Sequence, residues 1–158
     1  MNAAGLDLLK SFESCRLTAY LDGAGVVTLG WGHTGPDVSI LDTCTQEQAD
    51  AWLVEDVAHT ETELGHMLIA PVTSNQFAAL VCLGYNIGVG ALHQSTLLKF
   101  VNDGDAAQAT EQFVRWDKVA GAESAGLLRR REAERDLFLT PDIIETAVRS
   151  ALDGTGLG

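Results

Sequence analysis

The chain has 158 residues, of which 46% are hydrophobic and 20% are charged. This length predicts one domain, and the composition is typical of a globular protein rather than of a disordered chain. The net charge of −12 argues against a nucleic-acid partner, because such partners require a basic surface. No apolar run approaches the roughly 18–20 residues that span a bilayer, so stable membrane insertion is not expected.

The N-terminal segment, residues 1–7, lacks a basic stretch followed by an apolar one, so we expect that a signal peptide is absent or has been removed, and we expect no membrane anchor. The three cysteines, Cys15, Cys44 and Cys82, are an odd number and show no CxxC spacing. We expect reduced thiols, with one disulfide plus one free thiol as the alternative. A metal site is not expected from this pattern.

Apolar residues at helical spacing predict a short helix over residues 3–13. Residues 17–34 are rich in β-forming residues and are interrupted by glycines within 22–25, which predicts a small β-hairpin or β-meander. After Pro36 the pattern becomes helical and remains so to the end of the chain.

Capping residues predict where the later helices begin. Thr45 and Thr73 each start a capping box, and Ser95 and Asp105 are candidate N-caps. Thr140 followed by a proline predicts a last helix to about residue 152, with a frayed end at 154–158. The other expected helices cover about 45–64, 73 to the glycine-containing end at 86–90, 95–102, 105–116 and 127–139.

A small β-element followed by helices predicts an α+β fold in which helices dominate. We expect a single domain over 1–158 with two lobes. The small lobe covers about 14–65, and the larger helical lobe covers about 66–158 together with the helix 3–13. A cleft between two such lobes is a common place for a substrate site.

Two carboxyl groups and a hydroxyl lie within 16 residues of the sequence: Glu13, Asp22 and Thr28. Hydrolysis of an acetal requires one protonated carboxylic acid to donate to the leaving oxygen and one ionised carboxylate, and a hydroxyl can hold the attacking water. On the residues alone, the alternative is that these are a helix-end charge, a turn former and a strand residue.

Residues 12–34 read FESCRLTAYLDGAGVVTLGWGHT and resemble phage-type lysozymes, the muramidase endolysins of glycoside hydrolase family 24. Glu13, Asp22 and Thr28 match that family's pattern of Glu, eight residues, Asp or Cys, five residues, Thr. The similarity covers about 6–139 and continues through FAALVCLGYNIGVGALHQSTLLKFVNDGD (77–105), FVRW (113–116) and GLLRRREAERDLF (126–138). The resemblance implies the two-lobed lysozyme-like fold.

The resemblance also implies hydrolysis of the β-1,4 bond between N-acetylmuramic acid and N-acetylglucosamine in bacterial peptidoglycan, with no metal or cofactor. It makes Glu13 the general acid. Asp22 becomes the carboxylate that stabilises the transition state and helps to orient water, and Thr28 positions that water. Members of the family invert the anomeric configuration, so we expect the two carboxyl groups to lie about 6.5–9.5 Å apart.

Four further residues are candidates for substrate binding. The resemblance places Tyr85 and Asn86 where the central helix meets the cleft, and the Asn86 amide either contacts the acetamido groups of the sugar or caps the helix. Trp31 either lines the cleft or packs under the hairpin. Trp116 either stacks on a sugar face or fills the core.

Two supporting interactions are also expected. The family places an arginine near the catalytic acid, so one of Arg129, Arg130 and Arg131 is expected to pair with Glu13, with Arg129 as the first choice. His33 is expected to be a hydrogen-bonded support rather than a catalyst.

As the sequence stands, the protein would gather in the host bacterial cytoplasm and would need a holin to reach the wall. We expect a monomer that acts on peptidoglycan glycan strands, with a Gram-negative wall as the target. Two rival functions are a lytic transglycosylase, for which a single glutamate suffices, and a non-catalytic wall-binding module, for which the triad would be damaged.

Overall fold

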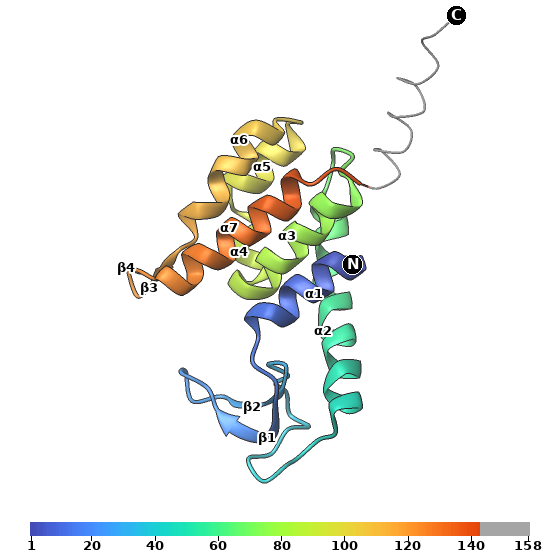
Figure 1. Ribbon diagram of the computed structural model, residues 1–158, viewed down its shortest axis with the longest axis vertical. Coiled ribbons are helices and arrows are strands. Elements are labelled where there is room, and N and C mark those ends of the chain that lie inside the picture. Colours follow the sequence, from blue (N-terminus) through green and yellow to red (C-terminus); the bar gives the residue numbers. More distant parts are fainter. Residues whose placement is uncertain (143–158) are drawn as a thin grey trace, which may run out of the picture.

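The computed structural model describes residues 1–142, and helices make up most of them (Figure 1). The expected last helix to about residue 152 and the expected frayed end at 154–158 lie outside the described residues. None of the helices in the described part is long and apolar enough to cross a membrane. The α+β fold with dominant helices is confirmed.

The N-terminal helix and the hairpin form where the sequence predicts them. Helix α1 (Ala3–Phe12) is capped at its start by Asn2, whose side chain accepts a hydrogen bond from the Gly5 backbone N–H. Strands β1 (Arg16–Leu21) and β2 (Val27–Gly30) pair antiparallel. The hairpin lies at one end of the molecule, away from most of the helices (Figure 1).

Helix α2 (Gln46–Met67) runs from the hairpin to the other helices and contacts both β2 and α3 (Figure 1). The capping box at Thr45 is present, as predicted. Ala49, Leu53 and Val57 are buried along one side of α2, which is the spacing expected for a helix that covers a core.

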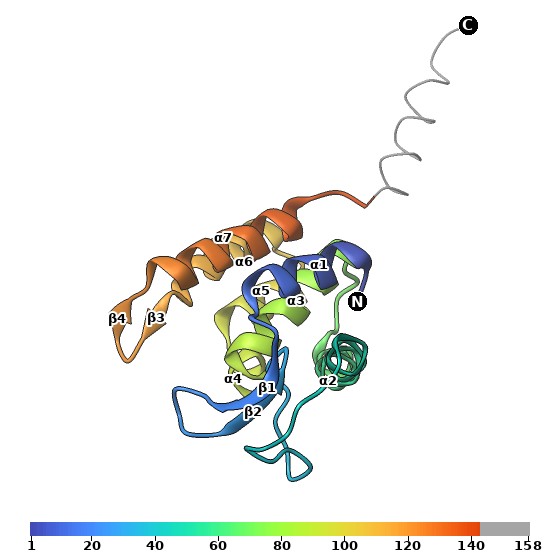
Figure 2. The same ribbon diagram turned by 60° about the horizontal axis from the view of Figure 1, so that its bottom comes forward.

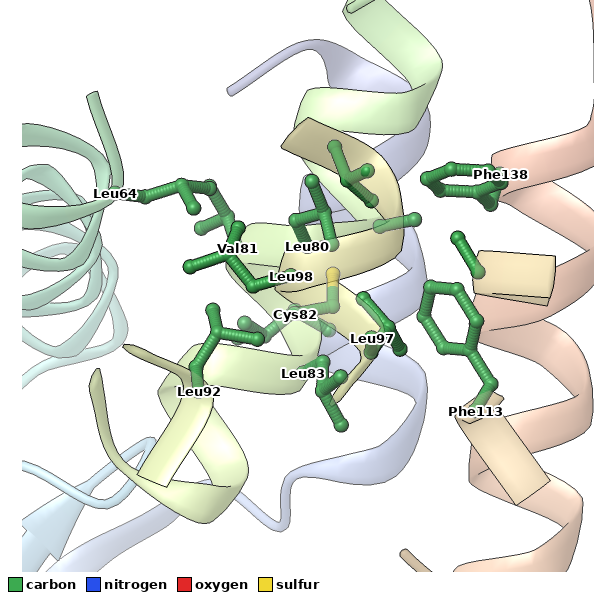
Figure 3. Packing of buried hydrophobic residues seen from close by; sticks show 14 of the residues in the cluster. Leu64, Leu80, Val81, Cys82, Leu83, Leu92, Leu97, Leu98, Phe113 and Phe138 are labelled. Atoms are coloured by element: carbon green, nitrogen blue, oxygen red, sulfur yellow. The ribbon is translucent and has the colours of Figure 1, made fainter. Parts of the chain in front are cut away.

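Helix α3 (Ser74–Ile87) is the centre of the helical lobe, and its predicted capping box at Thr73 is present. It contacts α1, α2 and α7 (Ala125–Leu139), and these helices surround it in Figure 2. Seven successive residues of α3, at positions 78–84, are buried, as expected for a helix with neighbours on every side. Figure 3 shows its side chains packed between Leu64 of α2 and Phe138 of α7.

The remaining elements connect α3 to α7. Ser95 and Asp105 are N-caps, as predicted. The elements are α4 (Val89–His93), α5 (Thr96–Asn102), α6 (Ala106–Gln112), the 3-10 turn η1 (Phe113–Arg115), β3 (Lys118–Val119) and β4 (Ala122–Glu123).

Three details differ from the expectations. The short helix α4 follows α3 immediately, and the helix expected to run to residue 116 ends at Gln112, where η1 begins. The hairpin β3–β4 was not expected, because its two-residue strands are too short to show an alternating pattern. Its turn residues Ala120 and Gly121 both have positive φ, which is the geometry of a type I′ turn.

Candidate active site

The β1–β2 turn fixes the Asp22 carboxylate. Asp22 follows β1, and its Oδ1 accepts hydrogen bonds from the backbone N–H groups of Ala24 and Val26, both at 2.8 Å. A short acidic side chain that binds the backbone of the residues ahead of it is a common turn former. Oδ1 is therefore fully engaged within the turn, and the carboxylate has a defined orientation.

Thr28 lies in β2 and is 3% exposed. Its hydroxyl donates to the Val26 carbonyl at 3.0 Å, and the same carbonyl accepts from the Asp22 N–H at 2.9 Å. In the hairpin register Tyr20 is opposite Thr28, and Asp22 is two positions after Tyr20. Because every second residue of a strand points to the same side, Asp22 and Thr28 share one face of the hairpin. The structure thus brings Asp22 and Thr28 together around Val26.

Glu13 is the C-cap of α1, and its backbone N–H donates to the Leu9 carbonyl at 3.1 Å. Its side chain is 22% exposed, and its Oε1 accepts a hydrogen bond from Arg130 Nη1 at 2.7 Å. Glu13 therefore stands at the junction of the two lobes, where the chain passes from α1 to β1, and its carboxylate is held by α7.

The arginine that pairs with Glu13 is Arg130, so the expectation that Arg129 does so is wrong. Arg129 is exposed, whereas Arg130 is buried on the inner side of α7. Successive residues of an α-helix point about 100° apart, so only one residue of the arginine run reaches the end of α1. The Arg130 guanidinium also lies 5.8 Å from the centre of the Phe12 ring.

Glu134 is a charged residue near the site that sequence reasoning missed. It is 0% exposed, and its Oε1 accepts from Arg130 Nε at 3.1 Å and from Arg131 Nη2 at 2.8 Å. The sequence feature that could have indicated this pair is the i, i+4 spacing of Arg130 and Glu134, which places two side chains next to each other on a helix.

A groove of about 490 Å³ lies between α2 and α3, and its lining includes Asp56, His59 and Tyr85. The Tyr85 hydroxyl donates to the Trp31 carbonyl at 3.5 Å. Burial raises the pKa of Tyr85, and the nearby charges of Asp56 and Glu13 add to the rise. Tyr85 therefore lines the groove and also lies close enough to Glu13 for the Glu13 charge to affect its pKa.

Asn86 and Trp116 occupy different environments. Asn86 is exposed in the last turn of α3, and its side chain makes no hydrogen bond to any residue among 1–142. Trp116 is partly buried, packs against the helical core and lines a hollow of about 240 Å³ beside Leu97. Its position fits the packing alternative, and the Asn86 amide remains available to a ligand.

Trp31 connects the hairpin to both neighbouring helices. Its indole N–H donates to Asp50 Oδ1 at 2.6 Å, and Lys10 Nζ donates to the same oxygen at 3.0 Å. Lys10 Nζ also lies 5.3 Å from the centre of the Trp31 ring. These hydrogen bonds, the one from Trp31 first, lower the pKa of Asp50.

His33 supports the loop that follows β2. Its Nδ1 lies 3.0 Å from Asp56, its Nε2 lies 3.4 Å from Asp37, and its ring stacks on Trp52 at 4.8 Å. Burial alone would lower the pKa of His33, but the hydrogen bonds and charges of the two aspartates raise it above its ordinary value of 6.5. Both ring nitrogens are thus committed to structure.

Within residues 1–142, no three or more His, Cys, Asp or Glu side chains are arranged to hold a metal ion. The three cysteines are free thiols. The candidate residues themselves offer two carboxyl groups and a hydroxyl: Glu13 in an ion pair, Asp22 fixed by a turn, and the hydroxyl of Thr28.

Comparison with known proteins gives one consistent family. The family model described as phage lysozyme matches residues 10–134. An endolysin of Bacillus phage B103 is 41% identical over 142 residues, which are 89% of this chain and 54% of that protein. The chain thus spans about half of that relative's length.

Two other relatives match over almost their whole length. An endolysin of Acyrthosiphon pisum secondary endosymbiont phage 1 is 45% identical over 138 residues, which are 85% of this chain and 94% of that protein. The solved structure of the muramidase domain of SpmX from Asticaccaulis excentricus has a TM-score of 0.83 at 37% identity, covering 89% of this chain and 97% of that domain.

Proposed function

The chain belongs to the phage lysozyme family, and on that premise we propose that it is an endolysin that hydrolyses bacterial peptidoglycan. The bond cleaved is the β-1,4 bond between N-acetylmuramic acid and N-acetylglucosamine. One observation carries the proposal: the two carboxylates of the family's motif are held by hydrogen bonds from different parts of the fold. Arg130 of the helical lobe holds Glu13, whereas backbone N–H groups of the hairpin hold Asp22.

In the proposed reaction Glu13 donates a proton to the leaving glycosidic oxygen as the bond to the anomeric carbon breaks. Asp22 remains ionised and stabilises the positive charge that develops on the sugar. Because Asp22 Oδ1 is engaged in the turn, Oδ2 is the oxygen that faces the substrate and the water.

Thr28 has a specific part in this scheme. Its hydroxyl hydrogen is donated to the Val26 carbonyl, so its oxygen lone pairs accept a hydrogen bond from the attacking water. That water attacks the anomeric carbon from the side opposite the leaving oxygen, in a single displacement that inverts the configuration. Its proton passes to Asp22 as the new C–O bond forms.

Substrate contacts by Asn86, Tyr85 and Trp31 are part of the proposal, whereas the packing of Trp116 against the helical core favours a structural part for that residue. The exposed Asn86 amide, which is unpaired among residues 1–142, is the best supported of these contacts. We also propose that the protein acts as a monomer on glycan strands, and that a holin gives it access to the wall.

The test is digestion of purified peptidoglycan, with mass spectrometry of the fragments and NMR of the new anomeric centre. We expect reducing fragments with the inverted, α configuration. Glu13→Gln and Asp22→Asn should each lose about 10²–10⁴-fold in rate. Asp42→Asn is the matched control, because Asp42 is another loop aspartate of this lobe whose carboxylate accepts a backbone N–H, that of Ser39 at 2.7 Å.

The products separate the alternatives. Anhydro ends in place of reducing ends would make the protein a lytic transglycosylase and remove Asp22 from the chemistry. No release of fragments by the wild type, with binding to peptidoglycan intact, would leave a wall-binding module. Equal losses in Asp42→Asn and Asp22→Asn would show that the aspartate effect is structural.

A further inference from the structure

Behind Glu13 lies a buried cluster of three charged residues on α7. Arg131 and Glu134 are 0% exposed and Arg130 is 5% exposed. Charged side chains are almost never fully buried unless they are paired. Here they form a continuous series of contacts that ends at Glu13.

The contacts hold the Arg130 guanidinium from two sides. Its Nη1 donates to Glu13 at 2.7 Å, and its Nε donates to Glu134 Oε1 at 3.1 Å. The guanidinium is planar and rigid, so fixing Nε fixes the direction in which Nη1 points. Arg131 anchors Glu134 in turn, through Nη2 at 2.8 Å, and donates from Nη1 to the Trp116 carbonyl at 3.5 Å.

The cluster is not explained by stability. Arg130 Nη2, Arg131 Nε and Glu134 Oε2 are buried and have no hydrogen-bond partner among the described residues. Unsatisfied buried polar atoms are costly, and replacing a buried ion cluster with apolar side chains of similar volume is often neutral or stabilising. A role in orienting Arg130 would explain why charged side chains are buried at these positions, which packing alone does not explain.

Charge gives Glu134 a second effect. Arg130 alone would place an uncompensated positive charge beside Glu13, whereas Glu134 binds the same guanidinium and offsets that charge. Helix α3 faces the cluster with Cys82 and Tyr85, and burial raises the pKa of both, that of Cys82 to about 12, so both are neutral. Within residues 1–142, Glu13 and Glu134 are the carboxylates that bind Arg130.

We propose that Glu134 is a positioning residue for the glycosidase reaction, which holds Arg130 in register with Glu13 and offsets the positive charge that Arg130 places beside it. The inference rests on the proposed function, in which Glu13 is the acid. Arg131 has the matching role of anchoring Glu134.

The test measures kcat and KM against pH on soluble peptidoglycan oligomers. Glu134→Gln should lower kcat about tenfold or more with KM little changed, since small misplacements at an active site cost that much. Activity falls at high pH when the acid loses its proton, and this basic limb should move down by about one pH unit, because Arg130, which contacts Glu13, then lacks its second carboxylate partner. Glu134→Asp keeps the charge and should restore the position of the limb.

Two variants complete the design. Glu132→Gln makes the same change on an exposed residue of α7 and should leave both kcat and the basic limb unchanged. Arg131→Gln removes one positive charge and should move the limb in the opposite direction, to higher pH. If circular dichroism shows that Glu134→Gln does not fold, the shift of the basic limb in Arg131→Gln still tests the inference.

A basic limb that stays fixed in folded Glu134→Gln, or that fails to rise in Arg131→Gln, overturns the inference. So does an equal loss of kcat in Glu132→Gln. Full activity of Glu13→Gln, assayed alongside, would instead refute the proposed function itself. The two failures are therefore distinguishable.

Discussion

Arg130 on α7 donates a hydrogen bond to Glu13 at the end of α1 across 2.7 Å, and the two residues are 117 positions apart in the sequence. This contact ties the expected acid, at the junction of the lobes, to the helical lobe. The orientation of the Glu13 carboxylate depends on the geometry of Arg130 as well as on the charge of Arg130, because an arginine offers several donors in one rigid plane.

We therefore expect Arg130→Lys to lower kcat about tenfold or more, although the positive charge is kept. A lysine cannot bind Glu13 and Glu134 together with a fixed fork of donors. Arg129→Lys is the control, because Arg129 is exposed on the same helix and should tolerate the change. The measurement is the rate of fragment release from peptidoglycan, with thermal unfolding to confirm the fold. Equal rates for the two variants would contradict the assignment of Arg130.

Which arginine meets Glu13 could not be predicted from the sequence. The buried stripe of α7 consists of residues 130, 131, 134 and 138, and three of these four are charged. A stripe of this kind has helical spacing but no apolar periodicity, so hydrophobic patterning does not reveal the orientation of the helix. The partner also lies on a helix at the other end of the chain, and only the folded structure brings the two together.

Elements defined by local chemistry were predictable. The capping boxes at Thr45 and Thr73 mark the starts of α2 and α3, and the glycine-containing turn marks the β1–β2 hairpin. The end of α6 depends instead on packing, since Phe113 of η1 is 0% exposed against the core. Asp22 and Thr28 are candidates through the resemblance to the family's motif, and the hairpin register brings them together locally. Asp50 instead meets Lys10 and Trp31, which are 40 and 19 positions away. Glu134 is linked to the site through the contact of Arg130 with Glu13, 117 positions apart.

The pair of His33 and Asp56 should make stability depend on pH. The pKa of His33 is raised above 6.5, mainly because the hydrogen bond and charge of Asp56 outweigh burial. A histidine whose pKa is higher in the folded state stabilises the fold fully below its unfolded value and loses that effect as pH rises through the folded value. The stabilisation is therefore fully present in mildly acidic solution, below pH 6.5, and is lost as pH rises through the raised pKa of His33.

We expect Asp56→Asn to lower the free energy of unfolding by about 1.5–3 kcal/mol near pH 5.5 and by clearly less near pH 9. Denaturant unfolding at the two pH values measures this difference. Glu55→Gln is the control, since Glu55 is exposed and adjacent on α2 and should show no such pH dependence. The same loss for Asp56→Asn at both pH values would mean that His33 is not charged in the pair.

The close approach of α1 and α3 gives a prediction on stability alone. A Cβ atom added at Gly5 would lie 2.7 Å from the Cβ of Ala78, nearer than two such atoms approach in folded proteins. Gly65, exposed in α2, has no atom within 4 Å of the same added position. Alanine is the better helix former at both sites, so the two substitutions differ in packing.

Gly5→Ala should therefore lower the free energy of unfolding by about 1–3 kcal/mol, because the backbones of α1 and α3 must separate. Gly65→Ala should raise it by about 0.5–1 kcal/mol, because the gain in helix propensity meets no clash. Because α1 leads directly to Glu13, Gly5→Ala should also lower the rate of peptidoglycan hydrolysis, whereas Gly65→Ala should not. Stabilisation by both substitutions would mean that α1 and α3 pack less closely than the structure places them.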